Sequence, residues 1–249
     1  MQKLSNKIAV ITGGNSGIGF AMAKAFIAEG AQVLLVGRRA DAVDPAVAAL
    51  GPQALGLTGD VSDLATHDRV AALARQQFGG VDIYAANAGI NRIQQSADVT
   101  PPDYDAQFST NARGTFFGVQ AIVPVMRDGG AILLTSSIAT HKVLDGHAVY
   151  AGSKAAIEAF ARSWARELSE RRIRVNVLSP GPTNTPIIEK LGVPADAVPE
   201  LEQQMARTIP LGRMGDAEEL ARAAVFLASA DSSFVTGVNL AVDGGIILA

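Results

Sequence analysis

Short apolar runs recur along the chain, and helical patterns fill the intervals between them. Most of the runs are continuous rather than alternating, which is typical of strands buried on both faces of a parallel sheet. The runs are residues 8–12, 33–37, 54–60, 81–87, 131–137, 173–180 and 238–244. Because strands that alternate with helices form βαβ units, the pattern predicts an α/β fold with one doubly wound sheet and helices on both faces.

Capping residues mark several helix ends. Residues 63–80 follow Ser62, which we expect to cap the helix N-terminus, and Thr100 and Pro101 open the next helix. The helix predicted over 150–172 is apolar on more than one side. That composition indicates burial, either under the sheet or against another subunit.

Composition bounds the class of protein. The 249 residues are 48% hydrophobic with a net charge of -3, which is ordinary for a globular chain and gives no basic face for nucleic acid. We expect one domain over residues 1–249, with the proline-rich segment 181–210 as a mobile substrate lid. The absence of cysteine, of a signal peptide and of a membrane-length apolar run favours a cytoplasmic protein that binds no membrane.

A glycine-rich turn, TGGNSGIG, joins the first apolar run to the first helix at residues 12–19. Small residues let the backbone approach a pyrophosphate, and the helix N-terminus offers unpaired amides and the positive end of its dipole. A tight turn without a ligand could use the same residues, but the strand before it and the helix after it favour phosphate binding. The predicted contacts are Gly13, Asn15, Ser16, Gly17, Ile18 and Gly19.

Further markers follow this turn in a fixed order. They are Thr12-Gly13-x-x-x-Gly17-x-Gly19, Asp60-Val61, Asn87-Ala88-Gly89, Asn111, Ser137, Tyr150-x-x-x-Lys154 and Pro180-Gly181. Together they resemble the short-chain dehydrogenase/reductase family over nearly the whole chain. The resemblance implies a single Rossmann-like domain with about seven strands in the order 3-2-1-4-5-6-7, and a nicotinamide dinucleotide cofactor.

Tyr150 and Lys154 stand four residues apart on a predicted helix, so their side chains share one face. We expect the ammonium group to lower the tyrosine pKa, which suits proton exchange with a carbonyl or alcohol oxygen. Ser137, at the end of a strand, can hold the same oxygen. The resemblance further implies that Lys154 holds the nicotinamide ribose and that Asn111 supports a water relay. The alternative is a strand-capping serine and an ordinary aromatic on the helix surface.

The resemblance assigns the remaining cofactor contacts. Asp60 would bond the adenine amino group, and Thr183 and Thr185 would hold the nicotinamide carboxamide and the phosphate. These residues could instead be a strand-end acid and threonines that shape a proline-rich turn. The contacts implied beyond the glycine turn are Asp60, Val61, Asn87, Ala88, Gly89, Tyr150, Lys154, Pro180, Gly181, Thr183 and Thr185.

The sequence VLLVGRR, residues 33–39, indicates which dinucleotide is preferred. Gly37 stands where NAD-binding relatives carry an acid, and an acid would repel the 2′-phosphate of NADP. Arg38 can grip that phosphate with charge-assisted hydrogen bonds, and Arg39 can assist. Ser16 stands where a second basic residue is common, so we predict a clear but not absolute preference for NADP(H). Two solvated arginines are the alternative.

Histidines and apolar residues near the predicted site suggest the substrate contacts. His67 is expected to be a solvated helix residue, and the spacing of the histidines predicts no metal site. The apolar candidates would favour a ketone with hydrophobic substituents, although they could equally be local core, and the histidine candidate could be a surface polar group. The candidate contacts are Ile138, Leu144, His147 and Ile187.

We therefore expect an NADPH-dependent enzyme that reversibly reduces a ketone or aldehyde, a small molecule. A 3-oxoacyl-thioester reductase is the close rival, weakly disfavoured because segment 181–210 carries two basic residues against four acids. A non-catalytic dinucleotide sensor could dispense with Tyr150 and Lys154, yet both are present. We expect a homotetramer or homodimer that assembles through helix 150–172.

Overall fold

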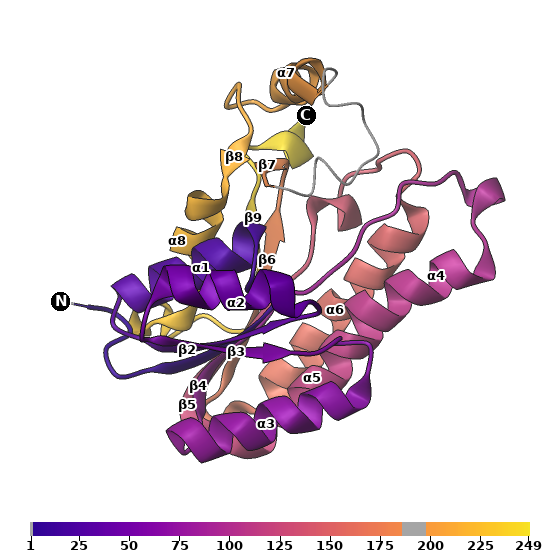
Figure 1. Cartoon of the computed structure of the whole chain (residues 1–249). Coiled ribbons are helices and arrows are strands. Elements are labelled where there is room, and N and C mark those ends of the chain that lie inside the picture. The colour runs from indigo at the N-terminus through magenta and orange to yellow at the C-terminus, as the bar shows by residue number, and fades with distance from the viewer. Residues whose placement is uncertain (1, 186–197) are drawn as a thin grey trace.

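A parallel sheet of seven strands forms the centre of the computed structural model, which describes residues 2–185 and 198–249 (Figure 1). The strands are β1 (Ile8–Thr12), β2 (Gln32–Gly37), β3 (Ala54–Thr58), β4 (Val81–Ala86), β5 (Met126–Thr135), β6 (Arg174–Pro180) and β9 (Asn239–Val242). Their order is β3-β2-β1-β4-β5-β6-β9, which confirms the predicted topology. The predicted strand ends shift by a few residues, most at β5, which begins at Met126.

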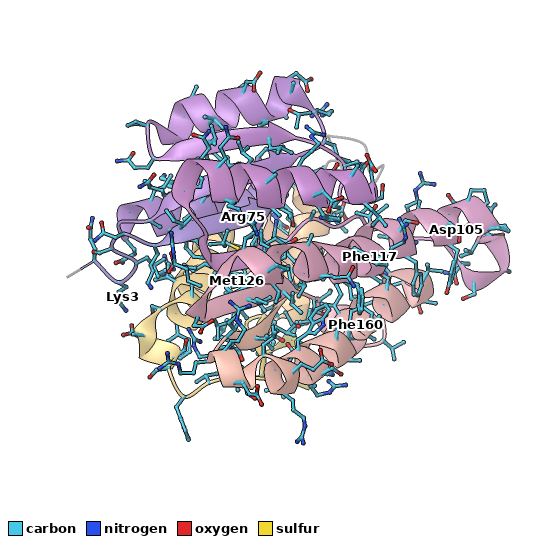
Figure 2. The ribbon with its side chains drawn as sticks, turned by 90° about the horizontal axis from the view of Figure 1, so that it is seen from below. Lys3, Arg75, Asp105, Phe117, Met126 and Phe160 are labelled. Atoms are coloured by element: carbon cyan, nitrogen blue, oxygen red, sulfur yellow. The ribbon has the colours of Figure 1, made fainter. Side chains whose placement is uncertain are left out.

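Helices cover both faces of this sheet (Figure 1). One face carries α1 (Gly17–Ala28), α2 (Ala40–Leu50) and α8 (Ala217–Ala228). The other carries α3 (Leu64–Phe78), α5 (Gly114–Ile122) and α6 (Ala148–Glu167). Figure 2 looks onto this second face, where Arg75, Phe117 and Phe160 mark α3, α5 and α6. Between α3 and α5 in sequence, α4 (Pro101–Phe108) extends beyond the sheet (Figure 1).

The central strands bury both of their faces, as their continuous apolar runs predict, whereas the edge strands β3 and β9 are mostly half-buried. In β1 all five residues are buried, and Ala9 and Ile11 join the core under α1 and α8 while Val10 joins the core under α3, α5 and α6. In β2 the residues alternate in the same way between the two cores. Because side chains of a strand point alternately to opposite faces, a strand between two helical layers needs apolar residues at every position.

The start of α3 differs from the prediction. Its N-cap is Asp63, whose side chain accepts a hydrogen bond from the Ala65 amide. Ser62 is not the cap, because its amide and its hydroxyl both donate to Asp60 Oδ1 at 2.8 Å. At α4 the prediction is confirmed: Thr100 accepts a hydrogen bond from the Asp103 amide.

Above the carboxyl ends of the strands lie the remaining described elements. Strands β7 (Thr183–Asn184) and β8 (Gly215–Asp216) pair there, and helix α7 (Val198–Thr208) stands beside the C-terminus (Figure 1). Residues 181–210 are therefore not irregular throughout, since α7 forms part of them. Within the described ranges, none of the helices combines the length and the apolar character needed to cross a bilayer.

Candidate active site

The glycine turn closes tightly between β1 and α1. Gly13 has a φ of +65°, and a Cβ there would lie 3.0 Å from Ala88 Cα. A Cβ on Gly19 would lie 2.2 Å from the Gly13 carbonyl oxygen, so only glycine allows this packing. Ser16 is the N-cap of α1 but makes no side-chain cap hydrogen bond. Within the described part of the chain, the first-turn amides of α1 therefore have no side-chain acceptor, which fits a bound phosphate.

The loop after β4 is fastened to this turn by hydrogen bonds between side chains and backbone. The Thr12 hydroxyl accepts from the Asn87 and Ala88 amides at 3.0 and 3.1 Å, and Asn87 Nδ2 donates to the carbonyl oxygens of Thr12 and Gly13. Asn87 Oδ1 also accepts from the Thr135 hydroxyl of β5. The ends of β1, β4 and β5 are thus joined around Asn87, as expected for residues of one site.

Lys154 lies below this junction, on the buried side of α6. It is only 2% exposed, and its Nζ donates to the Thr135 carbonyl oxygen at 2.7 Å. Burial lowers the pKa of Lys154 to about 8, because a charge is poorly solvated there. A Cβ on Gly89 would lie 3.0 Å from this Nζ. Glycine at position 89 therefore lets the loop after β4 pass close to the amine.

Tyr150 lies one turn before Lys154 and is half-buried. Lys154 Nζ is 5.9 Å from the centre of its ring. The expected lowering of the tyrosine pKa is wrong for the protein alone: burial raises the pKa of Tyr150, and a hydrogen bond with Ser137 opposes the rise. Loss of hydration of the phenolate raises the pKa more than the hydrogen bond with Ser137 lowers it, so the phenol is protonated at neutral pH. Ser137 is thus placed beside Tyr150, as predicted.

Asn111 is fully buried in a π-helical turn, Ser109–Arg113, between α4 and α5. Its Oδ1 accepts from the Ile90 amide, and its Nδ2 donates to the Ile90 carbonyl oxygen and to Ser153 Oγ, all at 2.9 Å. The Ser153 hydroxyl in turn donates to the Tyr150 carbonyl oxygen at 2.7 Å. Turns of this kind are frequent at functional sites. Asn111 therefore ties the loop after β4 to the helix that carries Tyr150.

The structure places the predicted adenosine contacts at the ends of β2 and β3. Arg38 and Arg39 are exposed. Arg39 Nε lies 3.7 Å from Asp41 Oδ1, whereas Arg38 makes no ion pair with any residue described. A Cβ on Gly37 would lie 2.4 Å from Asn15 Oδ1 and 2.8 Å from Val43 Cγ2. A side chain at position 37 would therefore have to displace Asn15 and Val43.

Asp60 and Val61 follow β3, and residues of the following loop and of α3 hold them. Asp60 Oδ1 accepts both hydrogen bonds from Ser62, and the Val61 carbonyl oxygen lies 2.8 Å from His67 Nε2. His67 is only 4% exposed, so the prediction of a solvated residue is wrong. Burial lowers its pKa, which favours a neutral ring that donates to Val61. The cause is the face of α3 on which His67 lies, which packs against α5.

The segment after β6 reaches the glycine turn. The Thr183 hydroxyl donates to the Gly181 carbonyl oxygen at 2.9 Å, and a Cβ on Gly17 would lie 3.4 Å from Thr185 Cβ. A Cβ on Gly181 would lie 2.6 Å from Asp243 Cα, so Pro180 and Gly181 pack against the chain after β9. Thr185 therefore stands beside Gly17 in the first turn of α1, the turn predicted to bind the cofactor phosphate.

The four predicted substrate contacts have different surroundings. Ile138 is buried in a small apolar cluster with Ile209, Met214 and Ile246, against which Val198, Leu201 and Met205 of α7 pack. Leu144 is half-buried. The His147 ring meets the Tyr150 ring edge to face at 6.2 Å, and its Nδ1 lies 2.8 Å from the Asp145 carbonyl oxygen. Ile187 lies outside the described residues.

Sequence reasoning missed several supporting residues of this site. Thr12 and Thr135 fasten Asn87, and Ser153 links Asn111 to Tyr150. Thr12 and Ser153 lie inside or beside quoted motifs, so their hydroxyls were visible signals. The apolar cluster around Ile138 had none, because Ile209, Met214 and Ile246 come from separate parts of the chain.

The chain resembles known proteins over nearly its whole length. A family model described as enoyl-(acyl carrier protein) reductase matches residues 13–247. The oxidoreductase asL5 of Sarocladium schorii is 44% identical, over 99% of this chain and 98% of that protein. The hydroxynaphthalene reductase-like protein Arp2 of Metarhizium majus is 33% identical, over 99% of this chain and 97% of that protein. A solved structure from Brucella melitensis, titled short-chain dehydrogenase/reductase SDR:glucose/ribitol dehydrogenase, has a TM-score of 0.92 and 31% identity, covering 98% of each chain.

Proposed function

Because the chain belongs to the short-chain dehydrogenase/reductase family, whose members are oxidoreductases that use nicotinamide dinucleotides, we propose that it reduces a ketone or aldehyde with NADPH. The proposal depends on one observation, which is that Ser137, Tyr150 and Lys154 lie together. Ser137 is hydrogen-bonded to Tyr150, and Lys154 is buried one helical turn after Tyr150. When bound, the nicotinamide supplies the hydride.

The protein's own residues handle the proton. Tyr150, protonated because burial raises its pKa, donates its phenolic proton to the oxygen of the carbonyl substrate. Ser137 donates a hydrogen bond to the same oxygen and so orients the substrate. Lys154 would hold the cofactor ribose, and a side chain at position 89 would crowd its amine. In the reverse direction the Tyr150 phenolate must accept the alcohol proton, so the rate of alcohol oxidation should increase as pH rises.

The preference for NADPH rests on Arg38 and Gly37. Arg38 is exposed beside the predicted ribose position, and Gly37 offers no acid to repel a 2′-phosphate. The remaining cofactor contacts are proposed as predicted, with Asp60 at the adenine and Thr183 and Thr185 at the nicotinamide end.

The proposed substrate is a bulky ring ketone, covered by segment 181–210. The similarity to a hydroxynaphthalene reductase-like protein supports a ring substrate. So does the apolar cluster in which α7 packs against Ile138, the residue after Ser137. A 3-oxoacyl thioester remains the second candidate, favoured by the description of the matching family model, which names an acyl carrier protein.

A substrate panel tests the proposal. Purified protein is mixed with NADPH or NADH and with fused-ring ketones, alkyl ketones or acetoacetyl thioesters, and loss of reduced-cofactor absorbance is followed. We expect turnover of the ring ketones with NADPH, and slower turnover with NADH. Preferred turnover of the thioesters would move the assignment to the second candidate, and no oxidation of either cofactor with any carbonyl would contradict both.

A further inference from the structure

A buried carboxyl group lies beside the proposed catalytic residues. Glu158 is on α6, one turn after Lys154, and is 8% exposed. A carboxylate loses much of its hydration in such a place, and it is tolerated only where hydrogen bonds or a charge replace the lost water. The partners of Glu158 therefore indicate what the residue does.

One oxygen of Glu158 binds both sides of the loop that carries Ser137. Oε1 accepts from the Ser136 hydroxyl at 2.8 Å and lies 2.6 Å from the Thr140 hydroxyl. The Thr140 hydroxyl also lies 2.8 Å from the Ser137 carbonyl oxygen. The residues immediately around Ser137 are thus held by a single carboxylate oxygen.

The second carboxylate oxygen of Glu158 lies near a series of polar groups that extends to β9 and β6. Glu158 Oε2 lies 3.5 Å from His141 Nε2, which is 3.1 Å from Asn239 Nδ2 of β9. Asn239 Oδ1 accepts from the Ser179 hydroxyl of β6 at 2.7 Å. The carboxyl group therefore connects the Ser137 loop with the carboxyl end of β6 and the first residue of β9.

We propose that Glu158 is a positioning residue, which fixes the Ser137 hydroxyl relative to Tyr150 and Lys154. The inference rests on the proposed role of Ser137 in holding the substrate oxygen. Tyr150, Lys154 and Glu158 belong to one helix, so their spacing is set by that helix alone. Ser137 comes from a separate loop, and Glu158 ties that loop to the helix. Because catalytic geometry tolerates little displacement, a loosened loop slows hydride transfer without removing any reacting group.

Two pairs of variants isolate this contact. Glu158→Gln keeps the shape but weakens the charge-assisted hydrogen bonds, and Glu167→Gln, an exposed position on the same helix, is its matched control. Thr140→Val removes one partner hydroxyl, whereas Thr140→Ser keeps it and should restore the rate. We expect Glu158→Gln and Thr140→Val to slow single-turnover hydride transfer about tenfold, with the Kd of NADPH unchanged.

A double-mutant cycle with Ser137→Ala decides the inference. If Glu158 acts through Ser137, Glu158→Gln should change the single-turnover rate by less than about twofold once Ser137 is alanine. An equal loss in both backgrounds, or no loss in the wild-type background, would overturn the positioning role. If Ser137→Ala itself leaves the rate intact, the failure lies in the proposed catalytic role of Ser137, which separates the two claims.

Discussion

Burial shifts the pKa values of Tyr150 and Lys154, which stand four residues apart on α6. For Lys154 it lowers the pKa to about 8, and for Tyr150 it raises the pKa above its ordinary value. Both shifts have the same physical cause, since the charged form of either group is poorly solvated. The pair is thus suited to proton donation near neutral pH, which is the direction that carbonyl reduction needs.

Lys154 gives a pH-dependent contribution to stability. Its pKa is about 8 in the folded chain against 10.5 ordinarily, so between these values the unfolded chain binds more protons. Unfolding free energy therefore rises with pH in this window and is constant, for this group, below it. Relative to Lys154→Met, the wild-type protein should gain about 3 kcal/mol between pH 8 and pH 10.5 in urea unfolding. A difference that does not change with pH would contradict the burial of a charged amine.

Arg38 should carry most of the preference for NADPH. Arg38→Gln removes a charge-assisted contact to the 2′-phosphate, worth about 1.5–3 kcal/mol, so the ratio of kcat/KM for NADPH over NADH should fall at least about tenfold. Arg39→Gln is the matched control, with a smaller change, because Arg39 lies near Asp41. Gly37→Asp should also favour NADH, but its Cβ would displace Asn15, so it tests charge less cleanly. An unaltered ratio in Arg38→Gln would refute the phosphate contact.

At the scale of elements, the ends of strands and helices place the functional groups. The carboxyl ends of β1, β4 and β5 meet around Asn87, and β6 delivers Pro180 and Gly181 beside them. Helix α3 also helps to position functional groups, because residues at its start hold the loop that follows β3. At one helix start, some residues can therefore stabilise the helix while neighbouring residues hold a ligand-binding group.

Variants of Asp63 and Ser62 should separate the stability of α3 from the binding of NADPH. Asp63→Ala removes the N-cap of α3 and should lower the free energy of unfolding by about 1 kcal/mol, with the Kd of NADPH unchanged. Ser62→Ala releases Asp60 Oδ1 and should weaken NADPH binding more than Asp63→Ala does. Urea unfolding and fluorescence titration measure the two effects. If Ser62→Ala proved to be the more destabilising change, with binding intact, the assignment of the cap would be wrong.

The sequence predicts the parts of the fold and of the site that motifs mark, but not the contacts that depend on how the helices and loops pack. Strand order and the grouping of Ser137, Tyr150 and Lys154 could be predicted, because the motifs that carry them stand in the sequence in an order and spacing that resemble one family. The state of His67 could not, because it depends on which side of α3 packs against α5. Glu158 carried no motif, and only the folded loop shows that it meets Ser136 and Thr140.

For the whole molecule, the outer surface of α5 and α6 is the feature with the clearest consequence. Phe117 and Phe160 are labelled on that face in Figure 2, and Phe160 packs edge to face on Phe116 with ring centres 5.2 Å apart. Small residues beside them, Ala155 and Ala159, are exposed on α6. Half-exposed aromatics next to small side chains favour close association with another surface.

Sedimentation should therefore show a dimer or tetramer at micromolar concentration. Ala159→Arg places a long charged side chain on the outer surface of α6 and should shift the protein toward monomer. Ala48→Arg, on the exposed side of α2, is the control and should leave the assembly unchanged. A wild-type protein that sediments as a clean monomer would refute the interface on helix α6.

Tyr150→Phe tests whether Tyr150 donates the proton during NADPH-dependent reduction. The variant removes one hydroxyl group and keeps the ring that packs against His147. Fluorescence titration should give a Kd for NADPH within about twofold of the wild type, while single-turnover hydride transfer to a ring ketone falls by about 10²–10⁴-fold. Hydride transfer at the wild-type rate with NADPH bound would contradict the proposed mechanism.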